Sequence, residues 1–557
     1  MNTFSLALKK YICRNIKFNK PFNMFSVKHS QPFLLFLVIT GLLISCKNDE
    51  KPKNIIAPLE EAIPQKETVA DKNGAELFTI YCSICHITPS IQDLPKNIWE
   101  KNVLPEMGAR LGIRTNGYTP FMEANVRITG VYPTIPLIEQ AVWDKISAYV
   151  LTEAPDSLKF DARTLNSTQE LTQFSENPFK LHKRNDKSML ITYFRYETQE
   201  NSLIIGNMNG DVIKHTFQDD QTSYLKKVKS AVTTYKKANG RQYLMEIGKL
   251  NPSQQVLGKL YKVERDGRLS QIGDLLHRPV DLLAEDLDGD GETEYIISEF
   301  GHLTGELSML KMDKKSNQLI KTTLVNLPGA IRIISEDMND DGKKDLVVLF
   351  AQGNESIFIF YQKDDMRFSQ EQVIRLSPVY GSSWFELVDY NLDGYKDIII
   401  ASGDNADYSV IPKPYHGIRV FINDSRNHFE QKYFHPINGA TRLIAKDFDQ
   451  DNDIDIAVIA SFSDFENYPE QSFVYLENTN PAKYLFKPYT FSKITSGSWM
   501  LMDSGDFDQD GDEDIFLTPL TLSFRQIPKE SVNKWEESGA DIMMLENQLY
   551  GKNEKTN

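Results

Sequence analysis

The sequence predicts a small all-α domain followed by an all-β propeller, and two observations support this fold class. The motif Cys82-Ser83-Ile84-Cys85-His86 lies between segments with helical periodicity in the first third of the chain. From about residue 180 onward, short β-branched strands alternate with five copies of one acidic loop. Repeats of 50 to 60 residues built from strands are typical of a β-propeller.

An apolar leader opens the chain. Residues 33–44 are apolar, follow Lys28 and precede Ser45-Cys46. This run is short for a membrane span and is typical of a signal peptide. Leu43-Ile44-Ser45-Cys46 resembles a bacterial lipobox, in which the cysteine is lipidated; the alternative is an uncleaved anchor helix. We expect a signal peptide over 1–45, lipidation at Cys46 and anchoring to a membrane of the bacterial cell envelope.

The charge of the chain restricts its partners. The formal net charge is −15, and the leader carries six basic and no acidic residues, so the mature chain is more acidic still. This balance argues against nucleic acid as a partner and suits a protein that binds cations. Residues 46–72 are charged, contain prolines and lack periodicity, which predicts a tether. Lys47-Asn48-Asp49-Glu50 resembles the sorting signals of Bacteroidota surface lipoproteins, although a plain linker fits equally, so periplasmic and surface exposure both stay open.

Residues 73–156 are expected to form the small helical domain. A first helix leads into the cysteine motif with three apolar residues on one face, Leu77, Phe78 and Tyr81. A second helix is expected over residues 137–150, with Pro136 in its first turn, where no amide donor is needed. This helix carries Trp143 and Tyr149.

The motif C-x-x-C-H is the attachment signature of c-type haem, in which two thiols bond the haem and the histidine ligates the iron. Together with its flanking helices it resembles a class I cytochrome c. The resemblance implies that Cys82 and Cys85 hold haem c covalently and that His86 is the proximal iron ligand. Met107, in a segment expected to be a loop, is the candidate distal ligand. Met122 is the alternative, and an open or different sixth position is a third possibility.

The acidic loops have nine residues, with oxygen-bearing side chains at positions 1, 3, 5 and 9 and usually glycine at position 6. Their starts lie 51, 52, 58 and 59 residues apart. Calcium takes six to eight oxygen ligands, and a backbone carbonyl is expected from position 7. The fourth copy has Asn452 at position 6, where asparagine tolerates the left-handed conformation best after glycine.

This pattern resembles the FG-GAP/VCBS repeats of integrin-like propellers, which implies one Ca²⁺ in each loop; the alternative is a merely acidic turn. The candidate calcium ligands are, in chain order, Asp286, Asp288, Asp290, Glu294, Asp337, Asn339, Asp341, Asp345, Asp389, Asn391, Asp393, Asp397, Asp447, Asp449, Asp451, Asp455, Asp506, Asp508, Asp510 and Asp514.

The expected propeller covers residues 181–550, after a linker over 157–180. Five blades carry the acidic loop, and two earlier units, at residues 189–206 and 243–263, have strand patterns without it. Together these predict seven blades, with six or eight as alternatives. The stretch 403–418, with Arg278 and Gly305, resembles bacterial VCBS proteins that carry an N-terminal cytochrome c domain. We interpret it as either a structural loop or a ligand site.

These features predict a haem-c electron-transfer lipoprotein whose calcium-stabilised propeller docks a redox partner protein or another ligand. One alternative is a quinoprotein-like dehydrogenase module that passes electrons to the haem; another is a glycan-binding or adhesion-type module. The sequence shows no nucleophile elbow, phosphate loop, H-x-x-x-H or H-E-x-x-H motif. It therefore favours an electron carrier over a self-contained enzyme, and we assign no catalytic residue.

Overall fold

The structure is a computed structural model that describes residues 71–123, 126–160, 168–181, 190–405, 409–491, 497–519 and 527–550. The expected signal peptide, Cys46 and nearly all of the expected tether lie outside these residues. All of the described residues belong to one compact unit of the chain, which extends to Asn557. Within the described ranges, no helix has the length and apolar character needed to cross a membrane.

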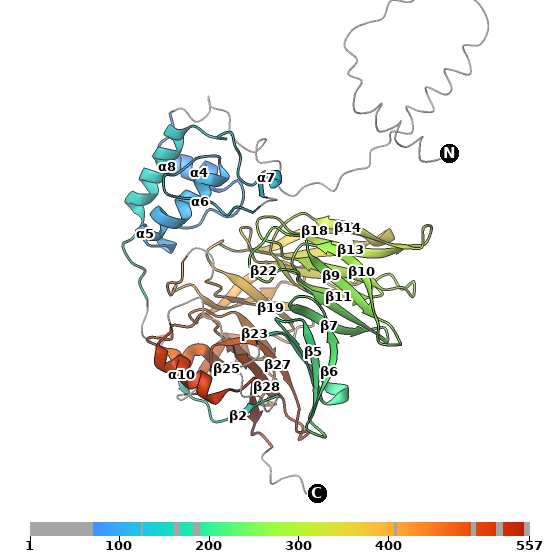
Figure 1. Ribbon diagram of the computed structural model, residues 1–557. Coiled ribbons are helices and arrows are strands. Elements are labelled where there is room, and N and C mark those ends of the chain that lie inside the picture. Colours follow the sequence, from blue (N-terminus) through green and yellow to red (C-terminus); the bar gives the residue numbers. More distant parts are fainter. Residues whose placement is uncertain are drawn as a thin grey trace, which may run out of the picture. The chain divides into compact units, whose positions relative to one another are not determined.

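Residues 71–160 form a small helical unit (Figure 1). Its α-helices are α4 (Gly74–Cys82), α5 (Lys96–Ile98), α6 (Leu104–Arg110), α7 (Val126–Thr129) and α8 (Gln140–Glu153), with a 3₁₀ turn at Ile91–Asp93 and a π-helical turn at Trp99–Val103. A capping box starts α4, because Asn73 and Glu76 each accept a hydrogen bond from the other's backbone amide. Helix α4 packs on α8, and Leu77, Ile146 and Val150 are fully buried in the shared core.

Helix α8 begins three residues later than the apolar pattern predicts. Leu137 lies in a bend, where its backbone amide donates to the carbonyl of Leu111 at 2.9 Å. Ile138 is buried in the core although it lies outside the helix. Pro136 therefore precedes the helix by several residues and does not lie in its first turn.

Seven sheets, built mainly of antiparallel strands, follow in the described residues and confirm the predicted seven-bladed propeller. Blade 1 contains β3 (Ile191–Glu197), β4 (Ser202–Asn207), β5 (Asp211–Thr216) and β6 (Gln221–Lys227). Blade 2 contains β7 (Val232–Ala238), β8 (Arg241–Glu246), β9 (Gly258–Val263) and β10 (Leu269–Leu276). Blade 3 contains β11 (Pro279–Glu285), β12 (Glu294–Glu299), β13 (Glu306–Asp313) and β14 (Gln318–Val325). Blade 4 contains β15 (Ala330–Glu336), β16 (Asp345–Phe350), β17 (Ser356–Lys363) and β18 (Arg367–Arg375). Blade 5 contains β19 (Ser382–Val388), β20 (Asp397–Ser402), β21 (Gly417–Asn423) and β22 (Phe429–Pro436).

The last two blades include strands from the N-terminal side of the propeller. Blade 6 has β23 (Arg442–Lys446), β24 (Asp455–Ile459), β25 (Phe473–Asn480) and β26 (Leu485–Thr490), and β1 (Gln169–Glu170) adds to it in parallel. Blade 7 has β27 (Trp499–Gly505), β28 (Asp514–Pro519) and β29 (Ile542–Asn547), and β2 (Phe174–Phe179) forms its outer strand. Helix α10 (Lys529–Ser538) lies between β28 and β29. Both β1 and β2 fall within the segment expected to be a linker, so part of that segment closes the ring instead.

The two faces of the propeller carry different loops. In blades 3 to 7, the acidic loop joins the first and second strands of the blade. The connections between second and third strands lie on the opposite face, because neighbouring strands run antiparallel. The helical unit contacts this opposite face: the Tyr415 hydroxyl donates to the Asp93 carbonyl at 2.7 Å, and Glu123 accepts from the Lys249 ammonium at 2.9 Å and from the Gln254 amide at 2.7 Å.

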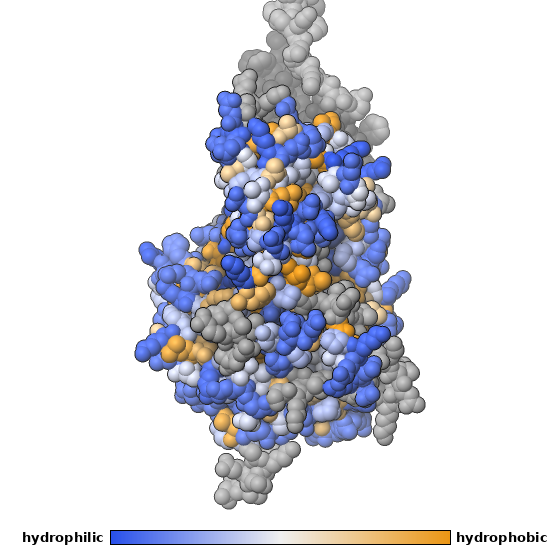
Figure 2. All heavy atoms as spheres, turned by 90° about the vertical axis from the view of Figure 1, so that its left-hand side faces the viewer, coloured by the Kyte–Doolittle hydropathy of each residue, from blue (hydrophilic) through white to orange (hydrophobic). Residues whose placement is uncertain are grey.

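Apolar side chains are gathered mainly inside the blades. The second strand of each of blades 3 to 7 is buried along its whole length, because it is covered by neighbouring blades on both sides. In the view of Figure 2, the described surface is mostly hydrophilic and its apolar patches are small and separate.

Candidate haem-binding and calcium-binding sites

The cysteine motif lies at the end of helix α4. Cys82 is the last residue of the helix and is partly buried, whereas Cys85 is exposed. Cys82 and Ile84 pack against the core of the helical unit, which includes Phe78, Trp99 and further aromatic residues. The motif thus borders an apolar, aromatic surface, as a bound haem requires.

His86 is held in one tautomer. Its Nδ1 lies 2.8 Å from the Ile87 carbonyl oxygen, and a carbonyl can only accept, so Nδ1 carries the proton. Burial lowers the pKa of His86, and the positive charges of Arg110 and Arg375 lower it further, against the opposing effect of the hydrogen bond to Ile87. A neutral imidazole with a protonated Nδ1 keeps Nε2 as a metal ligand. These features fit a proximal haem ligand.

The thiols are not activated for nucleophilic chemistry. Burial, with a smaller contribution from the neighbouring Cys85, raises the pKa of the Cys82 thiol to about 12. Burial also raises the pKa of Cys85. A catalytic cysteine needs a lowered pKa, so this pair fits covalent attachment of a cofactor better than a nucleophilic role.

The two candidate distal ligands differ in environment. Met107 is partly buried and packs against the same core as Cys82. It lies within helix α6, not in the predicted loop, since Pro105 is tolerated in the first turn of a helix. Met122 has 48% of its surface exposed. The partly buried position of Met107 beside the core makes it the better candidate of the two. Iron coordination stays a prediction for both residues.

A buried polar network beside Met107 was not anticipated. The Glu106 carboxylate is 5% exposed and accepts hydrogen bonds from Arg110 at 3.0 Å, Tyr118 at 2.5 Å and Tyr132 at 2.8 Å. The network holds the Arg110 guanidinium, whose charge acts on both His86 and Cys85. The sequence could have predicted only the pair of Glu106 and Arg110, which are four residues apart on one helix. Tyr118 and Tyr132 come from other segments, so their contacts with Glu106 could not be predicted.

The five acidic loops share one set of hydrogen bonds. The position-1 aspartate accepts from the backbone amide of position 5 at 3.0–3.2 Å and from that of position 6 at 2.7–3.1 Å in every loop. Position 6 has a positive φ in every copy, including Asn452 at +73°. Asparagine thus adopts the conformation that glycine has in the other loops. Position 4 is also left-handed in every loop, as the +59° of Gln450 illustrates.

The position-9 carboxylate is fully buried in all five loops. Asp514, for example, accepts from the backbone amides of Phe507 at 3.1 Å and Asn547 at 2.8 Å. Burial raises its pKa to about 8, and burial raises the pKa of Asp455 to about 7. This residue therefore ties the loop to the third strand of its blade in addition to offering oxygen to a cation.

Carboxylate oxygens converge in three of the loops. In loops 1, 4 and 5 one oxygen from each of three acids lies within 4.8 Å of the others, for Asp286/Asp288/Asp290, Asp447/Asp449/Asp455 and Asp506/Asp508/Asp514. Loops 2 and 3 carry asparagine at position 3, whose amide oxygen takes the place of a carboxylate. The hard oxygen donors of all five loops suit calcium.

Two lysines distinguish the first loop. The Lys311 ammonium contacts Asp288 and lies 3.4 Å from Glu294, and the Lys314 ammonium lies 2.9 Å from Asp290. Both lysines come from the region of the third strand, about 20 residues beyond the motif, so the repeat pattern did not reveal them. Both lysines therefore engage carboxylates that the repeat pattern predicts as calcium ligands.

The stretch 403–418 is partly described, since residues 406–408 lie outside the described ranges. Lys413 is buried and bonds the side chain of Asn405, whose amide donates to the Ile411 carbonyl at 2.6 Å. Tyr415 contacts Asp93 of the helical unit. Local hydrogen bonds and a contact between domains therefore account for these side chains.

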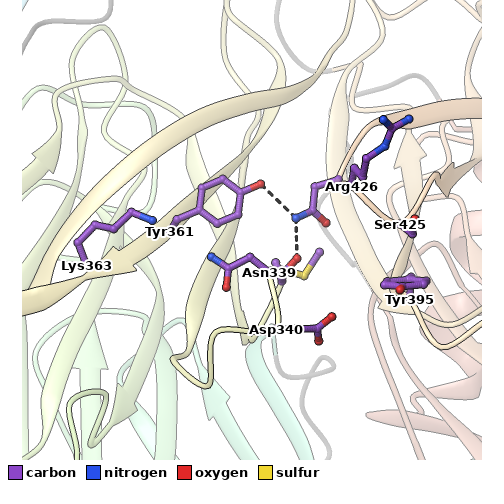
Figure 3. Close-up of a pocket in the computed structure, with 9 residues that line it drawn as sticks. Asn339, Asp340, Tyr361, Lys363, Tyr395, Ser425 and Arg426 are labelled. Atoms are coloured by element: carbon purple, nitrogen blue, oxygen red, sulfur yellow. Dashed lines mark hydrogen bonds between the residues drawn. The ribbon is translucent and has the colours of Figure 1, made fainter.

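A polar cavity of about 410 Å³ lies on the face of the acidic loops, between blades 4 and 5 (Figure 3). Asn339 and Asp340 of loop 2 and Tyr395 of loop 3 form part of its lining. The side-chain amide of Asn427 donates to the Met338 carbonyl at 2.6 Å and lies 3.1 Å from the Tyr361 hydroxyl, which joins the two blades at the cavity.

Comparison with known protein families agrees with the repeat architecture over part of the chain. Residues 337–400 match the FG-GAP-like repeat. This segment spans acidic loops 2 and 3, and with the seven sheets it supports a seven-bladed propeller built from FG-GAP-like repeats. Among solved structures, the chain is similar to the β-propeller domain of Myceliophteria thermophila Cps50 (Swd1), with 9% identity, a TM-score of 0.39, and coverage of 67% of this chain and 99% of that domain. No curated protein gives a significant sequence match.

Proposed function

We propose that this protein is a haem-c electron carrier of the bacterial cell envelope, held to the membrane by a lipid on Cys46. Cys82 and Cys85 hold the haem, His86 is its proximal ligand and Met107 its distal ligand. When bound, the haem supplies one-electron redox chemistry. The calcium-stabilised propeller serves as the platform that docks a redox partner protein.

The single observation that carries the proposal is the environment of the C-x-x-C-H motif. The motif ends a helix at an apolar, aromatic core, and its histidine donates through Nδ1 to the Ile87 carbonyl. Orientation of a ligating histidine by such a second hydrogen bond is common in metal proteins. A merely structural C-x-x-C-H turn has no need of this arrangement.

The protein's own residues have three tasks in this function. The hydrogen bond to Ile87 holds the proton on Nδ1 of His86. The core around Phe78 and Trp99 gives the motif an apolar side against which Cys82 and Ile84 pack. Arg110, held by Glu106, places a positive charge near the motif, which favours the electron-rich state of a nearby redox group.

Covalent attachment is the test of this function. The protein is produced with a c-type haem maturation system, and haem is extracted into acidified organic solvent. Wild-type haem should stay with the polypeptide, whereas Cys82→Ala with Cys85→Ala should yield protein whose haem, if any, extracts. Cys46→Ser is the matched cysteine control and should retain its haem. Extraction of the wild-type haem would refute the assignment.

The cavity of Figure 3 favours a second candidate function, binding of a polar ligand such as an acidic glycan. Its lining contains two cations, Lys363 and Arg426, against one acid, Asp340, although Arg426 also pairs with Asp424 at 3.0 Å. Tyr395 in the lining is 40% exposed. Titration with an acidic oligosaccharide, compared between wild type and Lys363→Ala, tests it; saturable binding that the substitution weakens would support this role.

A further inference from the structure

Loops 4 and 5 differ from the other three loops at position 7. They carry Asp453 and Asp512 there, where loops 1 to 3 have Glu292, Lys343 and Tyr395. The Oδ1 atoms of Asp453 and Asp512 are buried and have no hydrogen-bond partner. Asp512 is only 1% exposed, and its other oxygen accepts from the Tyr550 amide at 3.2 Å.

A buried oxygen without a partner costs about 1–3 kcal/mol. Such an atom in a native protein points to an ion or water that satisfies it. Both aspartates belong to loops in which three other carboxylates already converge, Asp447/Asp449/Asp455 in loop 4 and Asp506/Asp508/Asp514 in loop 5. An added side-chain ligand at position 7 gives these loops five carboxylates each, and more charge raises calcium affinity. The first loop also has an acid at position 7, but Glu292 is exposed to solvent. The first loop, by contrast, has lysines against its carboxylates.

The two loops are also joined directly. The side-chain amide of Gln450 in loop 4 donates to the Gly511 carbonyl in loop 5 at 3.0 Å. The Tyr550 hydroxyl donates to the side-chain carbonyl oxygen of Gln450 at 2.6 Å. The backbone amide of Tyr550 donates to the Asp512 carboxylate. Lys446, next to loop 4, forms an ion pair with Glu513 of loop 5 at 2.9 Å. Movement of one loop on binding an ion is therefore transmitted to the other.

This pair of loops lies where the ring closes. Gln173, which precedes the closing strand β2, donates to the carbonyl of Phe448 in loop 4 at 3.1 Å. The side-chain amide of Asn547, at the end of β29, donates to the same carbonyl at 2.8 Å. The backbone amide of Asn547 donates to the Asp514 carboxylate of loop 5. The residue that leads into β2 and the end of β29 thus both contact these loops.

We propose that loops 447–455 and 506–514 form one coupled calcium-binding unit, with Asp453 and Asp512 as additional ligands. This unit binds two ions more tightly than the other loops, binds them cooperatively and stabilises the closure of the propeller by β2. The inference rests on the proposed calcium binding. It adds that loops 4 and 5 bind their ions before the other loops, and that binding in one of the two strengthens binding in the other.

Calcium titration of the full-length, metal-stripped protein by calorimetry tests the inference. Two ions should bind first and cooperatively, ahead of weaker sites. Asp453→Asn with Asp512→Asn should weaken this first phase about tenfold or more, equal to about 1.4 kcal/mol or more. Glu292→Gln, the matched change at position 7 of loop 1, should leave the first phase unchanged. Five equivalent sites would overturn the inference but leave calcium binding intact, whereas no binding at all would overturn both.

Gln450→Ala with Lys446→Ala separates coupling from affinity, because the two changes remove the hydrogen bond to Gly511 and the ion pair with Glu513 and keep every proposed ligand. Cooperativity should disappear while two tight sites remain; retained cooperativity would overturn the coupling. Hydrogen exchange on the wild-type protein gives a readout that needs no variant. Protection of β2 should rise as the first two ions bind, and unchanged protection would overturn the role in ring closure.

Discussion

Nδ1 of His86 donates to the carbonyl oxygen of Ile87 across 2.8 Å, and this contact determines which ring nitrogen can face a metal. The proton on Nδ1 leaves Nε2 with a free lone pair, and the lowered pKa of the ring keeps it neutral at pH 7. This single hydrogen bond therefore leaves Nε2 of His86 as the ring nitrogen that could bind the haem iron predicted from the C-x-x-C-H motif.

Met107 is expected to be the distal haem ligand. In the ferric protein, methionine coordination gives a weak charge-transfer absorption near the red edge of the visible spectrum. Met107→Ala should abolish this band and lower the midpoint potential, because a thioether opposite histidine raises the potential. Met122→Ala is the matched control and should leave both unchanged, since Met122 is largely exposed. The reverse pattern would assign the role to Met122.

Calcium is expected to stabilise the propeller. A site held at about a hundredfold over its Kd adds about 2.7 kcal/mol to the free energy of unfolding. Several such sites rival the whole stability of a typical domain, about 5–15 kcal/mol. Chelation should therefore lower the melting temperature of the propeller sharply, as followed by calorimetry.

Asp508→Ala with Asp510→Ala should reproduce part of this loss by removing two of the predicted ligands of loop 5. The haem Soret band is expected to change little on chelation, because the motif and the acidic loops belong to different domains. An unchanged melting curve, with less than one calcium per chain by metal analysis, would mean that the acidic loops are only turns.

The repeat pattern predicted the acidic loops well because their geometry depends on neighbours within nine residues. Asn452 illustrates this: its tolerance of positive φ is a local property, and the structure has it at +73°. Blades 1 and 2 were also predictable, from apolar strands such as β4 and β8. Local sequence therefore predicted the acidic loops and seven blades, but not every strand of those blades.

The features that depend on distant contacts were not predictable. Strand β2 is polar along much of its length and contains Pro178, which suits an edge strand and not an obvious blade strand. Its pairing with β29 joins residues more than 350 positions apart. In the same way, the lysines at loop 1 and the contact of Tyr415 with Asp93 arise from three-dimensional proximity alone.

Cys46 is expected to carry a lipid. Cys46→Ser should move the protein from the detergent-soluble membrane fraction to the soluble fraction, because lipidation is the membrane anchor predicted from the leader. Fractionation and immunoblotting measure this. The cysteine variants of the haem motif should remain in the membrane fraction. If Cys46→Ser also remains there, the anchor lies elsewhere.

Glu355 is expected to make stability depend on pH. Its carboxylate is 2% exposed and accepts from the backbone amides of Gly381 and Ser382, both at 2.9 Å. Burial raises its pKa to about 7, against the opposing effects of these hydrogen bonds and of Arg419. The folded state thus holds a proton more tightly than the unfolded state. This contribution is present at low pH and is lost as the pH rises from the ordinary carboxyl pKa through about 7.

The loss between pH 5 and pH 8 amounts to about 3 kcal/mol at most, at 1.36 kcal/mol for each pKa unit. Glu355→Gln removes the titration, so its free energy of unfolding should change less over this range than that of the wild type. The substitution also leaves one backbone amide without its acceptor, which lowers stability at every pH. The informative quantity is therefore the difference in slope, measured by urea unfolding in saturating calcium so that the acidic loops stay occupied. Glu371→Gln, on the exposed face of β18, should keep the wild-type slope. Parallel curves for wild type and Glu355→Gln would show that the carboxylate is already ionised at pH 5.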